Sequence, residues 1–176
     1  MPADLLDLYQ RASRWTAEKV AAADDLDAET PCPEWRVRDL LNHMLDTQAY
    51  FAGAARGAEV SPPASPPPSL LTDDPSADFE RATNEVVDAY AQEGVIDKTG
   101  PALGIAFSDQ LLHGWDLARA TKQDATMPHG LAEAAYEHIH GRFTDEQRHG
   151  VFGPEIPVGD DATPQQRLLA YTGRAG

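Results

Sequence analysis

Apolar side chains recur at spacings of three and four residues in four long stretches of this chain. That period places them on one face of an α-helix, and such a face is buried by packing against other helices. The stretches are residues 3–23, 36–55, 74–94 and 101–121. No stretch of useful length alternates as a β-strand does, and the sequence has no internal repeat. The pattern predicts an all-α fold, a four-helix bundle whose successive helices run up, down, up and down.

Shorter elements are expected around this bundle. Residues 128–143 favour a fifth helix, and Thr163 to Gln166 form a capping box that opens a short last helix. We expect one domain over residues 1–176, with the bundle at about 3–145 and a C-terminal helical arm at about 146–176. Five prolines in residues 61–69, SPPASPPPS, favour a stiff extended connection, with a ligand for a proline-rich-peptide reader as the alternative.

The charge balance excludes several classes of partner. The chain has 29 acidic and 14 basic residues, a formal net charge of −15. Binding to nucleic acid needs an excess of Lys and Arg, and the same holds for anionic membranes, so neither partner is expected. The N-terminus lacks the basic and apolar regions of a signal peptide, and no apolar run is long enough to span a membrane. These features predict a cytoplasmic protein with small-molecule partners, either a monomer or a homodimer.

Ionisable residues lie on helix faces that are otherwise apolar. Asp109 and His113 are four residues apart in DQLLHGWDLARA, so they share one helix face. His43 occupies a similar position in LLNHMLD. Burial of an unpaired carboxylate costs several kcal/mol, and a divalent cation bound by all three groups would offset that cost. A hydrogen-bonded core network without metal remains the alternative.

The spacing of Asp109 and His113 is not specific by itself. The same D-x-x-x-H pattern occurs at Asp39–His43 and at Asp145–His149. Asp145 and His149 have polar neighbours, which indicates solvated residues, whereas Asp39 lies near a helix start, where its charge complements the helix dipole. Asn42, beside His43, is expected to point into solvent.

Three further residues are candidates for the surroundings of the site. Asp116 follows His113 by three positions and is expected either to orient that ligand or, as the alternative, to pair with Arg119 or cap a loop. Trp115 is expected to pack in the core, with the lining of a pocket as the alternative. Cys32, the single cysteine, excludes an internal disulfide, and it is either a small buried residue or a reactive thiol near the site.

Three segments together resemble a known family. They are TPCPEWRVRDLLNHM (30–44), LLHGWDLARAT (111–121) and FGPEIPVGDDATPQQRLLAYTGR (152–174). Over nearly its whole length the chain resembles an actinobacterial family of DinB-like metal-binding proteins, related to the metal-binding domain of mycothiol-dependent maleylpyruvate isomerase. The resemblance implies a DinB-like four-helix bundle whose metal ligands are one histidine of the second helix and a carboxylate-x-x-x-histidine pair of the last bundle helix. Those positions correspond to His43, Asp109 and His113, and the isomerase has glutamate where this chain has Asp109.

The resemblance also implies a chemistry. Three protein ligands leave positions open for reactants, as in a catalytic metal site. In relatives the metal, often zinc, activates a low-molecular-weight thiol; nickel and manganese are the alternatives here. We therefore expect a metal-dependent thiol (mycothiol) transferase or isomerase that acts on an unsaturated or electrophilic small molecule. The alternative is a non-catalytic metal- or ligand-binding stress-response bundle. Maleylpyruvate itself is not carried over, because the isomerase has a second domain for which too few residues follow Thr121.

Overall fold

The computed structural model describes residues 4–149 and 151–176, and every regular element in that part of the chain is an α-helix. The all-α fold class is therefore confirmed. The helices are α1 (Leu5–Ala21), α2 (Val37–Ala55), α3 (Pro75–Tyr90), α4 (Val95–Thr99), α5 (Ala102–Ala120), α6 (Leu131–Ile139), α7 (Asp145–Arg148) and α8 (Pro164–Tyr171). The two short helices α4 and α7 were not expected, and α6 is shorter than the predicted helix over 128–143.

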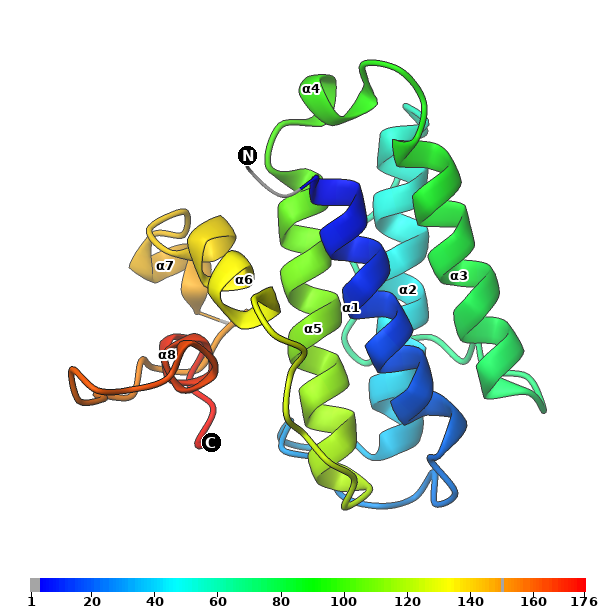
Figure 1. Cartoon of the computed structure of the whole chain (residues 1–176). Helices are drawn as coiled ribbons and strands as arrows, with labels where there is room; N and C mark the ends of the chain where they lie inside the picture. The colour runs from blue at the N-terminus through cyan, green and yellow to red at the C-terminus, as the bar shows by residue number, and fades with distance from the viewer. Residues whose placement is uncertain (1–3, 150) are drawn as a thin grey trace.

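The four long helices α1, α2, α3 and α5 form a bundle (Figure 1). Helix α1 packs beside α5 and α3, and α2 packs beside α3 and α5, so α1 and α2 lie across a diagonal of the bundle. The apolar faces meet in the middle, where Leu8, Phe107 and Leu111 belong to one buried cluster. This arrangement brings α2 and α5, the two helices that carry the candidate ligands, side by side.

The predicted alternation of helix directions is wrong at one step, because α2 and α3 run in the same direction (Figure 1). The proline-rich segment after α2 turns back along it. Asp46 accepts a hydrogen bond from the backbone N–H of Ala64 at 2.8 Å, and further along, Asn42 accepts one from that of Leu70 at 2.7 Å. Because residues 56–74 return along the bundle, α3 begins at the same end as α2.

The same contacts correct the expectation for Asn42. Its side chain is buried, and its Oδ1 accepts hydrogen bonds from the backbone N–H groups of Leu70 and Leu71 at 2.7 and 2.9 Å. Proline lacks an N–H group, so a proline-rich segment has few donors with which to attach itself. Asn42 uses two donors that follow the prolines and so attaches the end of this segment to α2.

Side chains at the helix starts explain where several helices begin. Asp74 accepts from the N–H of Ala77 at 3.0 Å, directly before Pro75 at the first position of α3. The capping box of Thr163 and Gln166 opens α8, as the sequence predicts. Asp39 accepts from the N–H of Arg36 at 2.9 Å. Its carboxylate therefore belongs to the start of α2.

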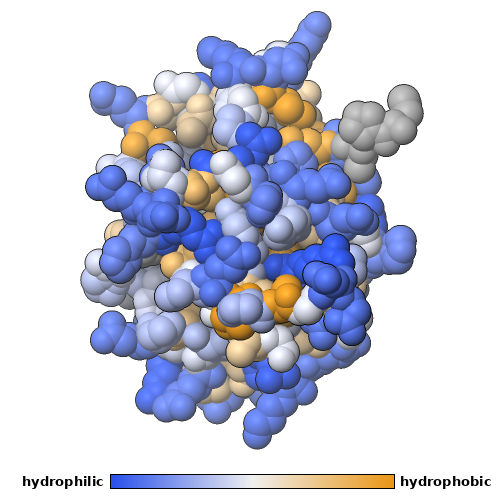
Figure 2. All heavy atoms as spheres, turned by 90° about the vertical axis from the view of Figure 1, so that its left-hand side faces the viewer, coloured by the Kyte–Doolittle hydropathy of each residue, from blue (hydrophilic) through white to orange (hydrophobic). Residues whose placement is uncertain are grey.

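Helix α6 packs on the outer side of α5, and α8 packs against α6 (Figure 1). Leu168, Leu169 and Tyr171 of α8 belong to the same buried cluster as the bundle residues, so one core joins the bundle and the arm. The outward face of this region is mainly hydrophilic, with apolar side chains in small separate groups (Figure 2). None of the helices described has the length and apolar character that a membrane crossing requires.

Candidate metal centre

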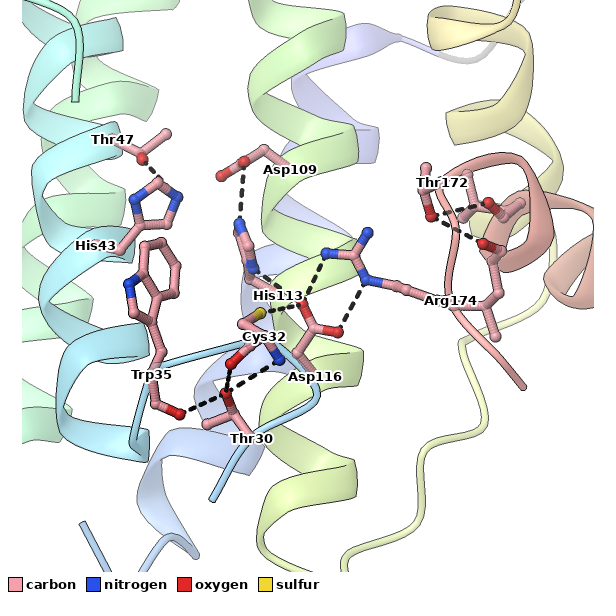
Figure 3. A network of polar contacts seen from close by, with 12 residues as sticks. Thr30, Cys32, Trp35, His43, Thr47, Asp109, His113, Asp116, Thr172 and Arg174 are labelled. Carbon is pink, nitrogen blue, oxygen red and sulfur yellow. Dashed lines mark hydrogen bonds and ion pairs between the residues drawn. The ribbon is translucent and has the colours of Figure 1, made fainter. Parts of the chain in front are cut away.

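The structure brings His43, Asp109 and His113 together. His43 lies on the side of α2 that faces α5, and Asp109 and His113 face it from successive turns of α5 (Figure 3). One nitrogen of each histidine and one oxygen of the aspartate all lie within 4.8 Å of one another. Neither helix alone carries all three donor groups. The contact between α2 and α5 brings them together into one cluster.

The cluster has the composition and nearly the dimensions of a transition-metal site. The Nε2 atom of His113 lies 3.3 Å from Oδ1 of Asp109. Two ligand atoms of one tetrahedral zinc ion, each about 2.1 Å from the metal, lie roughly 3.4 Å apart. No two of the three donor atoms are more than 4.8 Å apart, so small side-chain rotations suffice to bring them to that spacing. Two imidazoles and one carboxylate therefore fit a divalent metal here.

Asp116 fixes the orientation of His113. Its Oδ2 lies 3.0 Å from Nδ1 of His113, and its side chain is only 1% exposed. A proton held on Nδ1 by this hydrogen bond leaves the lone pair on Nε2, which faces Asp109 and His43. Metal-binding histidines typically donate their second ring N–H to a carboxylate in this way. Asp116 orients His113, and it does not pair with Arg119, which lies over the ring of Trp115 instead.

Arg174 of the C-terminal arm holds Asp116 from the other side. Its Nε donates to Oδ1 and its Nη2 to Oδ2, each at 2.8 Å (Figure 3). This is the two-point geometry in which guanidinium and carboxylate bind most strongly. No local pattern in the sequence marks Arg174 as a site residue, because its contact with Asp116 spans 58 residues.

The end of α8 explains how Arg174 reaches the site. The N–H of Gly173 donates to the carbonyl of Ala170 at 3.1 Å, and that of Arg174 to the carbonyl of Leu169 at 2.8 Å. Gly173 has φ +79°. These bonds form a Schellman turn, which ends the helix and favours glycine in the left-handed region. The turn directs Arg174 back toward α5.

Cys32 also lies at this network, in the loop before α2. Its Sγ is 3.3 Å from Oδ2 of Asp116, and Cys32, His113 and Asp116 form a second group whose spacing could suit a metal. Both oxygens of Asp116 already accept hydrogen bonds from Arg174. A metal in this second group would have to displace that arginine, so the group of His43, Asp109 and His113 is the better candidate.

The charges in the cluster are strongly coupled. Burial, followed by the nearby charge of His113, lowers the pKa of His43, which keeps this imidazole neutral and able to bind a metal. Burial would also lower the pKa of His113, but the charges and hydrogen bonds of Asp109 and Asp116 raise it well above its ordinary value. Burial would raise the pKa of Asp109, and His113 outweighs it and lowers that pKa. Without metal, His113 is a cation between two carboxylates.

A hydrogen-bonded network alone does not account for His43. Its Nε2 is 3.4 Å from Oγ1 of Thr47, whereas its Nδ1 is buried without a hydrogen-bond partner among the described residues. Buried polar groups are almost always paired, and a core network is expected to satisfy its members. A metal-free network therefore leaves Nδ1 of His43 without a partner, whereas Nε2, the nitrogen beside Thr47, lies on the side of Asp109 and His113 (Figure 3).

The cluster forms part of the wall of a cavity of about 690 Å³. The wall also includes Cys32 and the ring of Trp35, whose centre lies 4.6 Å from that of His43. Chain segments from the loop before α2, the proline-rich connection and the arm complete it. Trp115 is buried in the main core and does not line this cavity. The candidate ligands are therefore accessible to a small molecule.

Comparisons with known proteins identify relatives of the chain and its family. Two proteins of Mycobacterium tuberculosis, from the strains CDC 1551 / Oshkosh and H37Rv, are each 28% identical to this chain, over 97% of it and 98% of their own length, and both are described as uncharacterized. No solved structure matches. Residues 8–121, which contain the bundle helices α2, α3 and α5 together with His43, Asp109 and His113, match the family described as the mycothiol maleylpyruvate isomerase N-terminal domain. The chain belongs to that family, as the resemblance of its sequence segments implied.

Proposed function

We propose that this protein binds one divalent transition metal through His43, Asp109 and His113 and uses it in the chemistry of a low-molecular-weight thiol. One observation carries the proposal: three metal-binding side chains from two helices converge on the wall of a cavity, and a buried carboxylate orients one of them. Zinc is the expected metal, because two imidazoles and a carboxylate suit it. Mycothiol is the expected thiol, which rests on the family.

A metal held there would lower the pKa of a thiol and so supply the thiolate, which is the nucleophilic form. The protein's own residues would do the rest. Asp116 and Arg174 hold the ring of His113 in one orientation, and the cavity wall shields the reactants from bulk water. Three protein ligands leave room for a reactant.

Two reaction classes follow from a thiolate in this cavity. Addition of the thiolate to a carbon–carbon double bond leaves a single bond that can rotate, and loss of the thiol then gives the isomer. Attack on another electrophile gives a stable S-conjugate, with loss of a leaving group or uptake of a proton. The protein would accordingly be an isomerase or an S-transferase, with a thiol and a small electrophile as partners.

The first test is metal content, measured by mass spectrometry on tag-free protein. We expect about one equivalent of a divalent metal in the wild type and none in His113→Ala. His149→Ala is the matched control, because His149 belongs to the same D-x-x-x-H pattern but is exposed. Absence of metal from the wild type, even after incubation with zinc, nickel and manganese, would refute the metal site and leave a core network.

A second measurement separates catalysis from simple binding. The metal-loaded protein is incubated with a thiol and a panel of electrophiles, and thiol consumption is followed against His113→Ala. Consumption that depends on the metal supports a transferase or isomerase. Full metal occupancy without any metal-dependent turnover across the panel would favour the non-catalytic stress-response bundle.

A further inference from the structure

The charged groups that line the cavity are already paired, and this limits what the cavity can bind. Among the described residues of its wall, Arg174 is the only Lys or Arg side chain. Its Nε and Nη2 donate to Asp116, each at 2.8 Å, so its charge is paired, and its side chain is only 14% exposed. Because the positive charge of Arg174 is offset by Asp116 and little of its side chain is exposed, it is a poor receptor for the carboxylate or phosphate of a ligand.

The charges of the candidate metal site are also balanced. The two positive charges of a divalent ion would be offset by Asp109 and by one thiolate. Asp116 is offset by Arg174, and both histidines would bind the ion as neutral imidazoles. The remaining acidic side chain of the wall, Glu34, is exposed and therefore screened by solvent. Once the thiol is bound, the deep part of the cavity has no net charge for a second ligand.

The rest of the wall is mainly apolar. It includes the rings of Trp35 and Phe51, the side chain of Ile105 and several prolines from two loops. Polar groups there are hydroxyls, such as those of Thr47 and Tyr50, which can bind an uncharged acceptor. Aromatic and aliphatic walls with a few hydroxyls are typical of sites for neutral organic molecules.

From this charge pairing and this lining we infer that the electrophile is an uncharged, largely apolar molecule without a carboxylate or phosphate group. The inference rests on the proposed function and deepens it. An unsaturated acid would place its anionic group against acidic side chains with no free cation to receive it. Of the two reaction classes, S-transfer to a neutral electrophile is therefore favoured over isomerisation of an unsaturated acid.

The test compares three probes of one shape and different charge: phenylacetamide, phenylacetate and 2-phenylethylamine. Their dissociation constants are measured by ligand-observed NMR on zinc-loaded protein with saturating 2-mercaptoethanol, which occupies the thiol position. We expect the amide to bind at least about tenfold more tightly than the carboxylate, because one unfavourable charge contact is of that order. The amine should not bind more tightly than the amide. Tighter binding of either charged probe would overturn the inference.

Two variants identify the residues responsible. Asp116→Asn releases Arg174, and we expect the carboxylate to gain at least tenfold relative to the amide. If Asp116→Asn does not fold, the double variant Asp116→Asn/Arg174→Gln replaces it, because it removes both charges of the pair together. We expect unchanged carboxylate binding in this variant. A carboxylate that binds the wild type well and this variant poorly would identify Arg174 as an anion receptor and refute the inference. Arg167→Gln on α8 is the matched control, because that side chain is exposed and lies outside the cavity wall.

The same titrations on His113→Ala separate this inference from the proposed function. In this variant Asp109 keeps its negative charge, so the preference for the amide over the carboxylate should persist without metal. A protein that takes up no metal but keeps the preference would refute the proposed function and support the uncharged ligand. A protein that consumes thiol in a metal-dependent way but prefers phenylacetate would support the function and refute this inference.

Discussion

Replacement of Arg174 by alanine tests whether the C-terminal arm supports the site. In the native structure the Arg174 and Asp116 side chains are 14% and 1% exposed and share two hydrogen bonds of 2.8 Å. Removal of one partner of a buried ion pair leaves the other charge uncompensated and typically costs about 3–5 kcal/mol. Asp116 keeps its contacts with His113 and Cys32, so we expect the lower end of that range. The predicted loss is about 3 kcal/mol in the free energy of unfolding.

The assay is urea denaturation of Arg174→Ala beside the wild type, with Arg167→Ala as the control. A loss of about 3 kcal/mol corresponds to a fall of roughly 6–12 °C in Tm for a chain of this size. Arg167 is exposed, and its Nη2 donates to the carbonyl of Asp160 at 3.1 Å, so its loss should cost about 0.5 kcal/mol or less. A loss below about 1 kcal/mol in Arg174→Ala would contradict the assigned role of this pair.

The same variant should weaken metal binding. Loss of a residue that orients a metal ligand through hydrogen bonds typically lowers the metal affinity by about 10–100-fold. We expect Arg174→Ala to fall in that range in competition with a chelator, and Arg174→Lys to recover part of the loss through its single charge. An unchanged metal affinity, with stability lost, would show that the arm stabilises the fold without tuning the site.

Three further predictions follow from other parts of the structure. Gly114→Ala should destabilise the fold by about 1–3 kcal/mol in urea denaturation. The added Cβ would lie 2.9 Å from the Trp15 ring, so α1 and α5 would have to move apart. An unchanged denaturation midpoint would contradict this packing. Asp78→Asn tests a pH dependence. Burial would raise the pKa of Asp78, but hydrogen bonds from Thr72 lower this pKa overall. The carboxylate therefore stabilises the fold above about pH 4, and this stabilisation is lost as the pH falls through the lowered pKa. The stability gap between wild type and Asp78→Asn should therefore shrink from pH 5 to pH 2, and a constant gap would refute it. Removal of metal with a chelator should lower the Tm of the wild type by about 8–16 °C if the metal is present at 1,000 times its Kd, and should leave His113→Ala unchanged.

The candidate ligands could be identified from sequence because their signal is local. Asp109 and His113 share a helix face by their spacing, and apolar neighbours indicate that this face is buried. The three D-x-x-x-H pairs were distinguished by their neighbours alone, and the structure agrees: Asp39 caps α2, and Asp145 and His149 are exposed. Cys32 was named as a residue near the site, but its contact with Asp116 depends on the loop before α2.

The errors arose where the answer depends on distant contacts. Prolines predicted an extended connection over 61–69, but the direction in which it runs depends on Asn42 and Asp46 of α2. Asn42 was expected in solvent because helix geometry places it away from His43, and the returning segment buries it. A loop of that length can connect either end of the bundle, so the direction of α3 could not be obtained from spacing.

The sequence by itself therefore determined the helical class, the faces that are buried and the candidate ligand pair on α5, because the 3.6-residue period places residues three and four apart on one side of a helix. Only the tertiary structure decided the pairing of α2 with α5, the parallel run of α2 and α3, and the clamp of Arg174 on Asp116. Each of these joins segments far apart in the chain. Their contacts follow from the packing of whole helices, and no local pattern records which distant residue a side chain will meet.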